Sequence, residues 1–302
     1  MERSTSSPGT LTLAAFAVAV LLGGANFLAV RFSNQELPPF WGAGLRFTVA
    51  GVLFVFITST LRLKWPRGRE LALTGAYGIF TFTLSYALMY WALLQISAGM
   101  AAVVLAIVPL TTPLLASVQR LERLNRRALT GALIALAGIV WMTVEPEGAD
   151  LPLSGLVAIL VAAFTIGQSV ILGKRVSQNH PAVTNAVGMA VGAPLLLALS
   201  AIAGESWSLP TQPEVVWSVL YLVTFGSVGL FVAMLLVIRR WTASASSYAF
   251  VLFPVVTMLL EAWLADEPLT IRGLVGVAIV MAGVWVGALA PKRIRLAIET
   301  SG

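Results

Sequence analysis

The chain contains two copies of one unit. Residues 98–140 align without a gap with residues 243–285, at an offset of 145 positions. The matched residues include Pro109 with Pro254, Thr112 with Thr257, Glu122 with Glu267, Arg127 with Arg272, and Gly138 with Gly283. A weaker match at an offset of 144 pairs Gly23 with Gly167 and Arg31 with Arg175. Solenoid repeats have periods of about 20–50 residues, so each copy is expected to be a domain-sized unit.

Both copies are apolar enough to reside in a membrane. Apolar residues make up 58% of the 302 residues and charged residues 11%, whereas soluble domains carry about 25% charged residues. About 20 apolar residues span a bilayer, and a spanning backbone must be helical or part of a closed barrel. Ten stretches meet this requirement: 11–30, 39–61, 71–94, 98–119, 127–144, 154–173, 182–203, 215–238, 243–264 and 271–290. We therefore predict an all-α integral membrane protein with ten transmembrane helices, its two repeats covering 1–148 and 149–302.

The basic residues indicate the orientation of these helices. Sixteen of the 19 Lys and Arg residues lie at the N-terminus, in every second loop after it, or at the C-terminus. Cytoplasmic loops collect Lys and Arg, so both termini are predicted to be cytoplasmic. This topology signal accounts for the basic isoelectric point, and no nucleic-acid partner is expected. The loops leave no room for a soluble domain of useful size.

Each repeat has five helices, an odd number, so the second copy enters the membrane upside down relative to the first. Inverted repeats of this kind are typical of secondary transporters, which bind substrate near the midplane between the repeats. Exchanging the conformations of the two halves would convert an inward-open cavity into an outward-open one. The chain contains no G-x-x-x-x-G-K-[ST] loop, so ATP hydrolysis within it is not expected.

Several residues resemble those of a known family. The segment from Pro38 to Phe47, Asn26-Phe27 in the first helix, and the duplicated proline, Glu-x-Leu and glycine pattern are similar to ten-helix exporters of the drug/metabolite transporter superfamily. The resemblance covers nearly the whole chain and is greatest to the aromatic amino-acid exporters. It implies export of a small molecule, with no cofactor. The chain departs from the family in one respect, because Leu121-Glu122 and Asp266-Glu267 stand where Gly-Glu is usual.

Arg46 is the most unusual residue within a predicted helix. A charge at membrane depth costs about 3 kcal/mol on insertion scales and usually faces a cavity or a partner. Arg46 either binds a substrate carboxylate or serves as a scaffold by contacting backbone carbonyls or the outer interface. Glu261 lies one turn inside the outer end of its helix, where it is a cation site, a counter-ion to Arg46, or a group that reaches water.

Other polar residues at membrane depth are candidates for substrate binding. Tyr86 needs a partner for its buried hydroxyl and is expected to face the cavity. Asn26 and Gln168 lie in equivalent helices and either contact substrate together or join helices by hydrogen bonds. Tyr248 is a further deep polar group, whereas Tyr90 fits an interfacial aromatic belt.

Prolines and small residues suggest how the helices move and pack. Pro109 and Pro254 are equivalent, are predicted near mid-helix, and serve either as hinges or as static bends. Small residues on the last helix of each repeat favour close helix approach, either within the chain or in a dimer: Gly131, Ala135, Gly138, Gly276, Val280 and Gly283. A monomer is expected, because the chain already carries both halves.

Three classes of function were compared. We predict a secondary transporter that moves small metabolites, above all amino acids including aromatic ones, out across the inner membrane. The alternative is a proton-coupled multidrug exporter of lipophilic cations, with Glu261 as the membrane carboxylate. An enzyme would show clustered His, Asp, Glu or Cys at membrane depth, which this sequence lacks. The chain has no cysteine, and its single histidine, His180, lies in a loop, so no metal site is expected.

Overall fold

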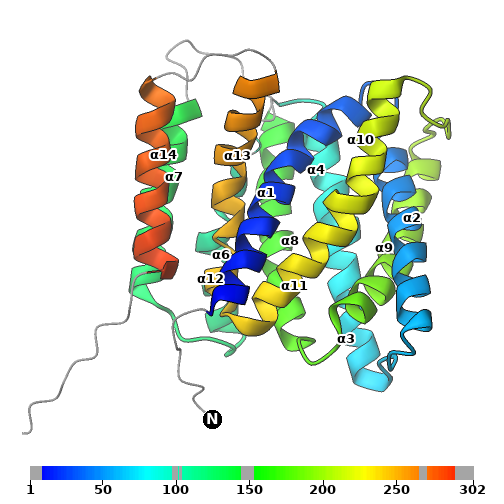
Figure 1. Cartoon of the computed structure of the whole chain (residues 1–302), viewed down its shortest axis with the longest axis horizontal. Helices are drawn as coiled ribbons and strands as arrows, with labels where there is room; N and C mark the ends of the chain where they lie inside the picture. The colour runs from blue at the N-terminus through cyan, green and yellow to red at the C-terminus, as the bar shows by residue number, and fades with distance from the viewer. Residues whose placement is uncertain (1–8, 97–100, 102–103, 144–152, 265–270, 290–302) are drawn as a thin grey trace, which may run out of the picture.

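The computed structural model describes residues 9–96, 101, 104–143, 153–264 and 271–289, and this part of the chain is a bundle of helices without strands (Figure 1). The first repeat contains α1 (Thr10–Ser33), α2 (Pro39–Thr60), α3 (Gly68–Gly78), η1 (Ile79–Ser85), α4 (Tyr86–Ala92), α6 (Val108–Val118) and α7 (Arg126–Thr143). The second contains α8 (Leu153–Arg175), α9 (Pro181–Ile202), α10 (Pro213–Val223), η2 (Thr224–Gly229), α11 (Leu230–Arg240), α12 (Ala243–Ser246), α13 (Ala249–Leu264), α14 (Ile271–Val284) and η3 (Trp285–Leu289).

Seven segments of the described chain are long and apolar enough to cross a membrane. They are α1, α2, α3–η1–α4, α8, α9, α10–η2–α11 and α12–α13. With the shorter or more charged helices α6, α7 and α14, they account for the ten predicted spans. The predicted boundary between the repeats, at residues 148 and 149, lies outside the described residues.

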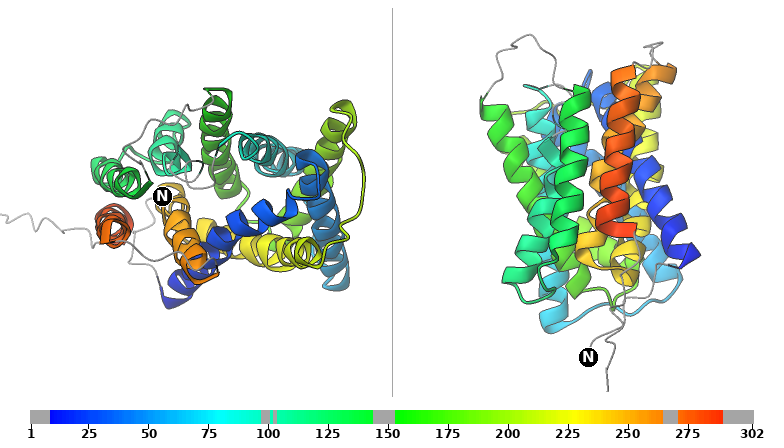
Figure 2. Two further views of the ribbon diagram at one scale, coloured as in Figure 1. Left: turned by 90° about the horizontal axis from the view of Figure 1, so that it is seen from above. Right: turned by 90° about the vertical axis from the view of Figure 1, so that its left-hand side faces the viewer.

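Equivalent helices of the two repeats pack against each other in antiparallel pairs. In the α2–α9 pair, Gly44 lies against Leu197 and Gly51 against Met189, so the two helices run in opposite directions. In the α7–α14 pair, Gly131 lies against Gly283, and Gly138 against Gly276. Two views show α14 alongside α7 (Figures 1 and 2). The second repeat is therefore inverted relative to the first.

The small residues of the last helices pack within the chain. A Cβ atom on Gly138 would lie 2.9 Å from the Gly276 carbonyl oxygen, and one on Gly283 would overlap the backbone of Ala135. Two equivalent arginines tie this pair at its ends. Arg127 Nε donates to the carbonyl of Val286 at 2.8 Å, and Arg272 Nε donates to the carbonyl of Trp141 at 2.7 Å. The two arginines are 145 positions apart, and so are the two residues whose carbonyls accept. The contact therefore recurs in the structure at the same offset as the sequence repeat.

The remaining helices are interleaved between the repeats. α1 packs against α10, α11 and α13 of the second repeat, and α8 packs against α3, α4 and α6 of the first. Neither repeat therefore encloses a complete core of its own. One of two main hydrophobic clusters is built on Phe47, Phe82 and Phe231 from both halves.

The third span of each repeat contains a π-helical segment at its centre. η1 and η2 begin at Ile79 and Thr224, which are 145 positions apart. Each has a serine whose hydroxyl donates to the carbonyl five residues earlier, Ser85 to Phe80 at 2.6 Å and Ser227 to Leu222 at 2.7 Å. π-Helical segments are rare and occur often at functional sites. The apolar pattern of the sequence predicts regular α-helices here and does not indicate either π-helical segment.

The fourth and ninth predicted spans are interrupted rather than continuous. Residues 106–107 form a turn before α6, so Pro109 lies in the first turn of a helix and not near mid-helix as predicted. Proline is well tolerated there, because the first backbone N–H groups of a helix have no intrahelical acceptor. Residues 247–248 form a break between α12 and α13, four residues before the position equivalent to 106–107, and Pro254 does lie inside α13.

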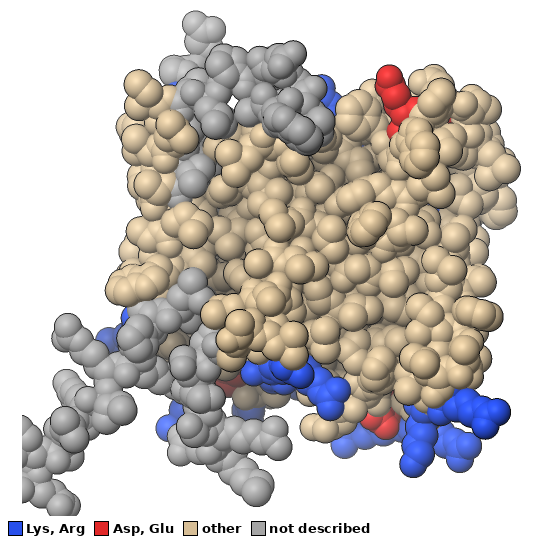
Figure 3. Space-filling model, viewed as in Figure 1, with Lys and Arg blue, Asp and Glu red and all other residues tan. Residues whose placement is uncertain are grey.

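Charge divides the molecule between its two ends. Lys and Arg side chains gather at the lower end of the space-filling view, where α3 begins and α11 ends (Figure 3). A band free of charged side chains covers the middle of this face. We call the lower end the basic end. The predicted grouping of basic loops on one side is therefore present in the structure.

Candidate functional site

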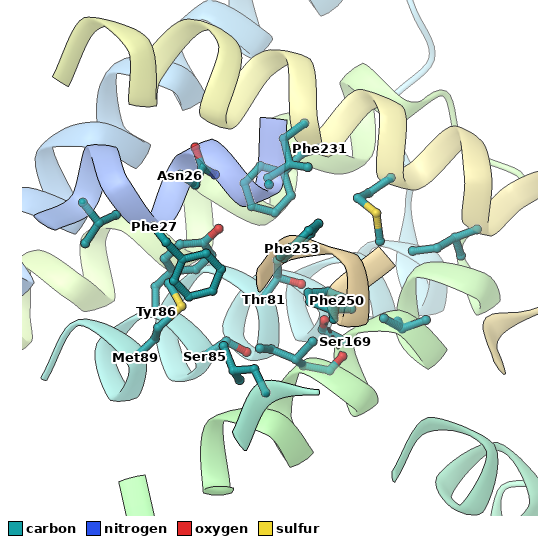
Figure 4. Close-up of a pocket in the computed structure, with 18 of the residues that line it drawn as sticks. Asn26, Phe27, Thr81, Ser85, Tyr86, Met89, Ser169, Phe231, Phe250 and Phe253 are labelled. Carbon is teal, nitrogen blue, oxygen red and sulfur yellow. Dashed lines mark hydrogen bonds between the residues drawn. The ribbon is translucent and has the colours of Figure 1, made fainter. Parts of the chain in front are cut away.

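A cavity of about 80 Å³ lies between the two repeats. Its walls come from α1 and the third span of the first repeat, and from α8, α11 and α13 of the second (Figure 4). The lining is mostly aromatic and aliphatic, with two methionines: Phe27, Tyr86, Met89, Leu93, Leu105, Phe231, Met234, Ile238, Phe250 and Phe253. Aromatic rings and thioethers form favourable contacts with one another and adapt to ligands of varied shape.

Four of these lining pairs are equivalent under the repeat. Tyr86 corresponds to Phe231, Met89 to Met234, Leu93 to Ile238 and Leu105 to Phe250, each at an offset of 145. The rings of Tyr86 and Phe231 meet edge to face at 6.1 Å between centroids. The cavity therefore lies on the approximate two-fold axis that relates the repeats, which is where inverted-repeat transporters bind substrate.

A few polar groups interrupt this apolar lining. Ser85 Oγ lies 2.9 Å from the hydroxyl of Thr165, and Ser169 donates to the carbonyl of Ile166. Within the described part of the chain, Asn26 Oδ1 and Thr81 Oγ1 are buried without a hydrogen-bond partner. Such groups are costly when unsatisfied, which makes both of them candidates to bind a polar group of a ligand. Among the described residues, the lining carries no ionised side chain.

Arg46 lies behind the cavity wall rather than in the lining. Its side chain is 1% exposed, and its Nη2 donates to the carbonyl of Gly226 at 2.7 Å and its Nε to Ser227 Oγ at 2.8 Å. The guanidinium carbon lies 5.2 Å from the ring centre of Tyr86, which does line the cavity. Within the described chain, the hydrogen-bond partners of Arg46 are neutral. The arginine thus joins α2 to η2 and places a positive charge next to the Tyr86 ring.

Asn26 reaches the same carbonyl from α1. Its Nδ2 donates to the Gly226 oxygen at 3.1 Å, so this oxygen accepts from two helices of the first repeat. A side chain at Gly226 would overlap Asn26 Oδ1, and only glycine permits this approach. Tyr90 also faces Arg46, with its hydroxyl 3.4 Å from Nη1. Tyr90 is fully buried, so its predicted place in an interfacial belt is wrong.

Two other predicted residues lie elsewhere. Gln168 Oε1 accepts from Gln119 Nε2 at 2.6 Å and does not line the cavity, so the structure does not bring Gln168 and Asn26 together. Its neighbour Ser169 lines the cavity instead. Tyr248 is fully buried between helices and donates to the Ala128 carbonyl of α7. Both residues join helices.

The remaining predictions fall at the edges of the described structure. Glu261 lies in the last turns of α13, but its side chain is outside the described part of the chain. Glu122 caps α12, where its carboxylate accepts from the backbone N–H groups of Ala243 and Ser244 and from the Ser244 hydroxyl. No cluster of three metal-ligating side chains occurs among the described residues.

Sequence reasoning identified Asn26 and Tyr86 in the cavity wall and missed most of the wall. The missed residues are apolar or carry only a hydroxyl, and such residues are common throughout a membrane bundle. The repeat itself held a usable signal, because Tyr86–Phe231 and Met89–Met234 match in chemistry at the 145 offset. Residues on a two-fold axis are expected to recur at the repeat period.

An inverted-repeat helical bundle with a central apolar cavity defines a membrane transporter. The model of the EamA-like transporter family matches this chain twice, over residues 10–144 and 153–288. The chain therefore belongs to that family and is a multi-pass membrane transporter rather than an enzyme. The two matches also agree with the predicted relationship to the drug/metabolite transporters.

Curated relatives and a solved structure support the same assignment. A "Probable amino-acid metabolite efflux pump" of Salmonella typhimurium is 28% identical and covers 94% of this chain and 97% of its own length. The "Uncharacterized inner membrane transporter YedA" of Escherichia coli K12 is 31% identical over 83% of this chain and 81% of its own. A solved crystal structure shares the fold with a TM-score of 0.76 at 22% identity, covering 94% of this chain and 98% of that one.

Proposed function

We propose that this protein is a secondary transporter that exports amino acids, including aromatic ones, across the inner membrane. The observation that carries the proposal is the cavity on the two-fold axis, whose described lining is rich in aromatic and thioether groups and contains no ionised side chain. Such a lining favours a solute with an apolar side chain and no net charge, as in a zwitterionic amino acid. Relatives named as an amino-acid metabolite efflux pump and a terminal-alkyne amino-acid exporter add support.

Two features supply recognition of the polar end of such a substrate. Asn26 Oδ1 and Thr81 Oγ1 are acceptors suited to an ammonium group, because no other described residue satisfies them. The positive charge of Arg46 behind the Tyr86 ring favours a carboxylate on that side of the cavity. Arg46 acts through Tyr86 in this conformation, since it does not line the cavity.

Transport is proposed to proceed by alternating access between the repeats. A cavity of about 80 Å³ is smaller than the roughly 150 Å³ that holds benzene in an engineered protein core. The walls must therefore move apart to admit an aromatic amino acid. The breaks before α6 and before α13, with Pro109 and Pro254 nearby, are the proposed hinges.

The orientation and assembly form part of the same proposal. The basic end is assigned to the cytoplasm by the positive-inside rule, which places both termini there. The close α7–α14 contact occupies the glycine faces that would otherwise be available for pairing with a second copy. We therefore propose a monomer that needs only a small-molecule substrate and the lipid bilayer, without a cofactor.

Counterflow in liposomes that contain only this protein tests the proposed substrate. The liposomes are loaded with unlabelled phenylalanine, and labelled phenylalanine is added outside without an ion gradient. Transient accumulation of label, blocked by other amino acids but not by lipophilic cations, is the expected result. Absence of accumulation together with pH-dependent movement of lipophilic cations would overturn the proposal. It would also make Glu261, the candidate carboxylate of a drug exporter, the first residue to substitute.

A further inference from the structure

The two ends of the cavity are closed differently, although the repeat makes them equivalent. At the basic end, α8 packs against α11. The equivalent helices of the first repeat are α1 and α4, and their described residues do not pack against each other to a comparable extent. An exact two-fold axis would make these two pairs identical. The difference shows that this conformation is closed at the basic end and less closed at the other.

On the third span of each repeat, the cavity residues near the basic end are more buried than their equivalents near the opposite end. Met234 and Ile238, near the basic end, are 7% and 3% exposed. Their equivalents Met89 and Leu93, near the opposite end, are only partly buried. Because each pair matches in size and chemistry, the difference reports the conformation and not the composition.

Lys174 connects α8 to the end of α11 at the basic end. Its ammonium group donates to the carbonyl oxygens of Ile238 at 2.8 Å and Arg239 at 3.3 Å, and to that of Trp241. These carbonyls are at or just past the C-terminal end of α11, where the last carbonyls of a helix lack intrahelical partners and favour a cation. One side chain thus ties α8 to the end of α11, beside the cavity residue Ile238.

The equivalent position in the first repeat has no such group. Val30 stands on α1 where Lys174 stands on α8, at the offset of 144. It lines the cavity, as does Leu93, the equivalent of Ile238. Valine cannot donate a hydrogen bond to the carbonyls at the end of the first repeat's third span. The two copies of the unit therefore differ at the residue that would close each end.

We propose that Lys174 is a latch that closes the basic end of the cavity and so sets the resting state of the transporter open toward the opposite side. Release of the latch frees α8 from α11 and allows the basic end to open, as the transport cycle requires. The inference rests on the proposed alternating access but not on the identity of the substrate. Lys174 is a positioning residue, because its effect on substrate acts through the end of α11.

Cysteine accessibility tests the latch, and the chain is suited to it because it contains no cysteine. Leu93→Cys and Ile238→Cys are made separately, each with and without Lys174→Met, which preserves an unbranched chain and removes the ammonium group. A membrane-impermeant maleimide is applied from one side at a time to oriented membranes. With Lys174 present, Leu93→Cys is expected to react from the side opposite the basic end, and Ile238→Cys to be protected.

Removal of the latch is expected to change both readouts in opposite directions. Hydrogen bonds to a charged group are each worth enough to shift an equilibrium by roughly tenfold or more, so Lys174→Met should raise Ile238→Cys labelling from the basic side by about that factor. Leu93→Cys labelling from the other side should fall at the same time. Lys174→Arg retains the cation and should behave like the parent. An increase at Ile238→Cys alone would indicate local loosening and overturn the proposal, as would no change at either position.

The reverse substitution provides an independent test. Val30→Lys places an ammonium group at the equivalent position, where it is expected to bind carbonyls at the end of the first repeat's third span. Leu93→Cys should then become protected, and Val30→Lys combined with Lys174→Met should invert the labelling pattern of the parent. Unchanged labelling in a properly folded double variant would contradict the latch. Because labelling needs no substrate, a failed counterflow assay and a failed latch remain distinguishable.

Discussion

The π-helical segments η1 and η2 have the same place in the two repeats but are stabilised by different chemistry. η1 is held by hydroxyl groups, through Ser85 to Thr165 at 2.9 Å and Thr83 to the Gly192 carbonyl at 3.1 Å. η2 is held by the guanidinium of Arg46 and the amide of Asn26. The position equivalent to Arg46 in the second repeat is Ala190. Duplication thus preserved the π-helical backbone while the hydrogen bonds that hold it to neighbouring helices diverged.

This difference suggests that the two segments contribute unequally to the transport cycle. A buried cation that binds a carbonyl is costly to release, because it cannot be left unpaired within the membrane. A hydroxyl pair is cheaper to break, since measured interhelical hydrogen bonds in membranes average about 0.6 kcal/mol. We therefore expect η2 to be the fixed segment and η1 to be the one that rearranges when the cavity changes shape.

Substitution of Arg46 should have the largest effect. Arg46→Met removes the donors to Gly226 and Ser227 while it preserves most of the side-chain volume. Hydrogen bonds to charged groups contribute about 1.5–3 kcal/mol each, so stability should fall by about 3 kcal/mol and transport should be lost. Thermal unfolding in detergent, followed by reconstituted transport, measures both.

Arg46→Lys sharpens the same comparison. Lysine keeps the charge but not the rigid planar group that reaches two acceptors together, so stability should be intermediate. If Arg46→Met unfolds at the same temperature as the parent, Arg46 does not fix η2. The contrast between the two segments would then be wrong.

Substitution at Ser85 should have a smaller effect on stability. Ser85→Ala removes the bonds to the Phe80 carbonyl and to the Thr165 hydroxyl, at a cost of about 1 kcal/mol. Because η1 is the segment expected to rearrange, the transport rate should change more than stability does. Turnover and unfolding temperature are measured on the same preparation.

Thr165→Val is the matched control for Ser85→Ala. It preserves the bond from Ser85 to Phe80 and removes the contact between the two spans, together with the local bond from Thr165 to the Ala162 carbonyl. We expect it to alter turnover in the same direction by a lesser amount. A stability loss at Ser85 as large as that at Arg46 would mean that both segments are fixed alike.

The sequence could predict the features that depend on residue type, but not those that depend on contacts between distant residues. The ten spans, their inversion and the grouping of basic residues followed from apolar length, an odd helix count and Lys/Arg placement, and each depends on residue type alone. The π-helical segments could not be predicted in this way, because their position depends on where a hydroxyl or a distant donor forms a hydrogen bond with a backbone carbonyl. Arg46 was recognised as unusual, but its partner Gly226 is 180 residues away in the chain. Only the packed structure decides between its roles as scaffold and as ligand.

The smallest predicted effect concerns the helices that lead into the two segments. Glu36 holds the chain just before α10, because its carboxylate accepts from the backbone N–H groups of Thr211 at 2.9 Å and Gln212 at 3.2 Å. The N-cap side chain makes no cap hydrogen bond in α10 or in α3, its equivalent. The Thr211 hydroxyl, followed by these backbone groups, holds the pKa of Glu36 below its usual value. A lowered pKa in the folded state stabilises the fold above the usual pKa of about 4.3, and the contribution disappears as pH falls through the lowered value.

Glu36→Gln should therefore lower the unfolding temperature slightly at pH 7 and have no effect at pH 3 or below, where the parent has largely lost the same contribution. The effect is small because Glu36 lies at the surface and is only partly buried, so solvent screens its interactions. Glu70→Gln in the first turn of α3 is the control, since Glu70 lies at the equivalent helix start. Among the described residues, the Glu70 carboxylate has no hydrogen bond to a distant segment like the one that Glu36 makes. A constant difference between Glu36→Gln and the parent at every pH would show that the Glu36 charge does not hold α10. An equal loss in Glu70→Gln would show that the two helix starts, unlike the segments that follow them, have remained energetically equivalent.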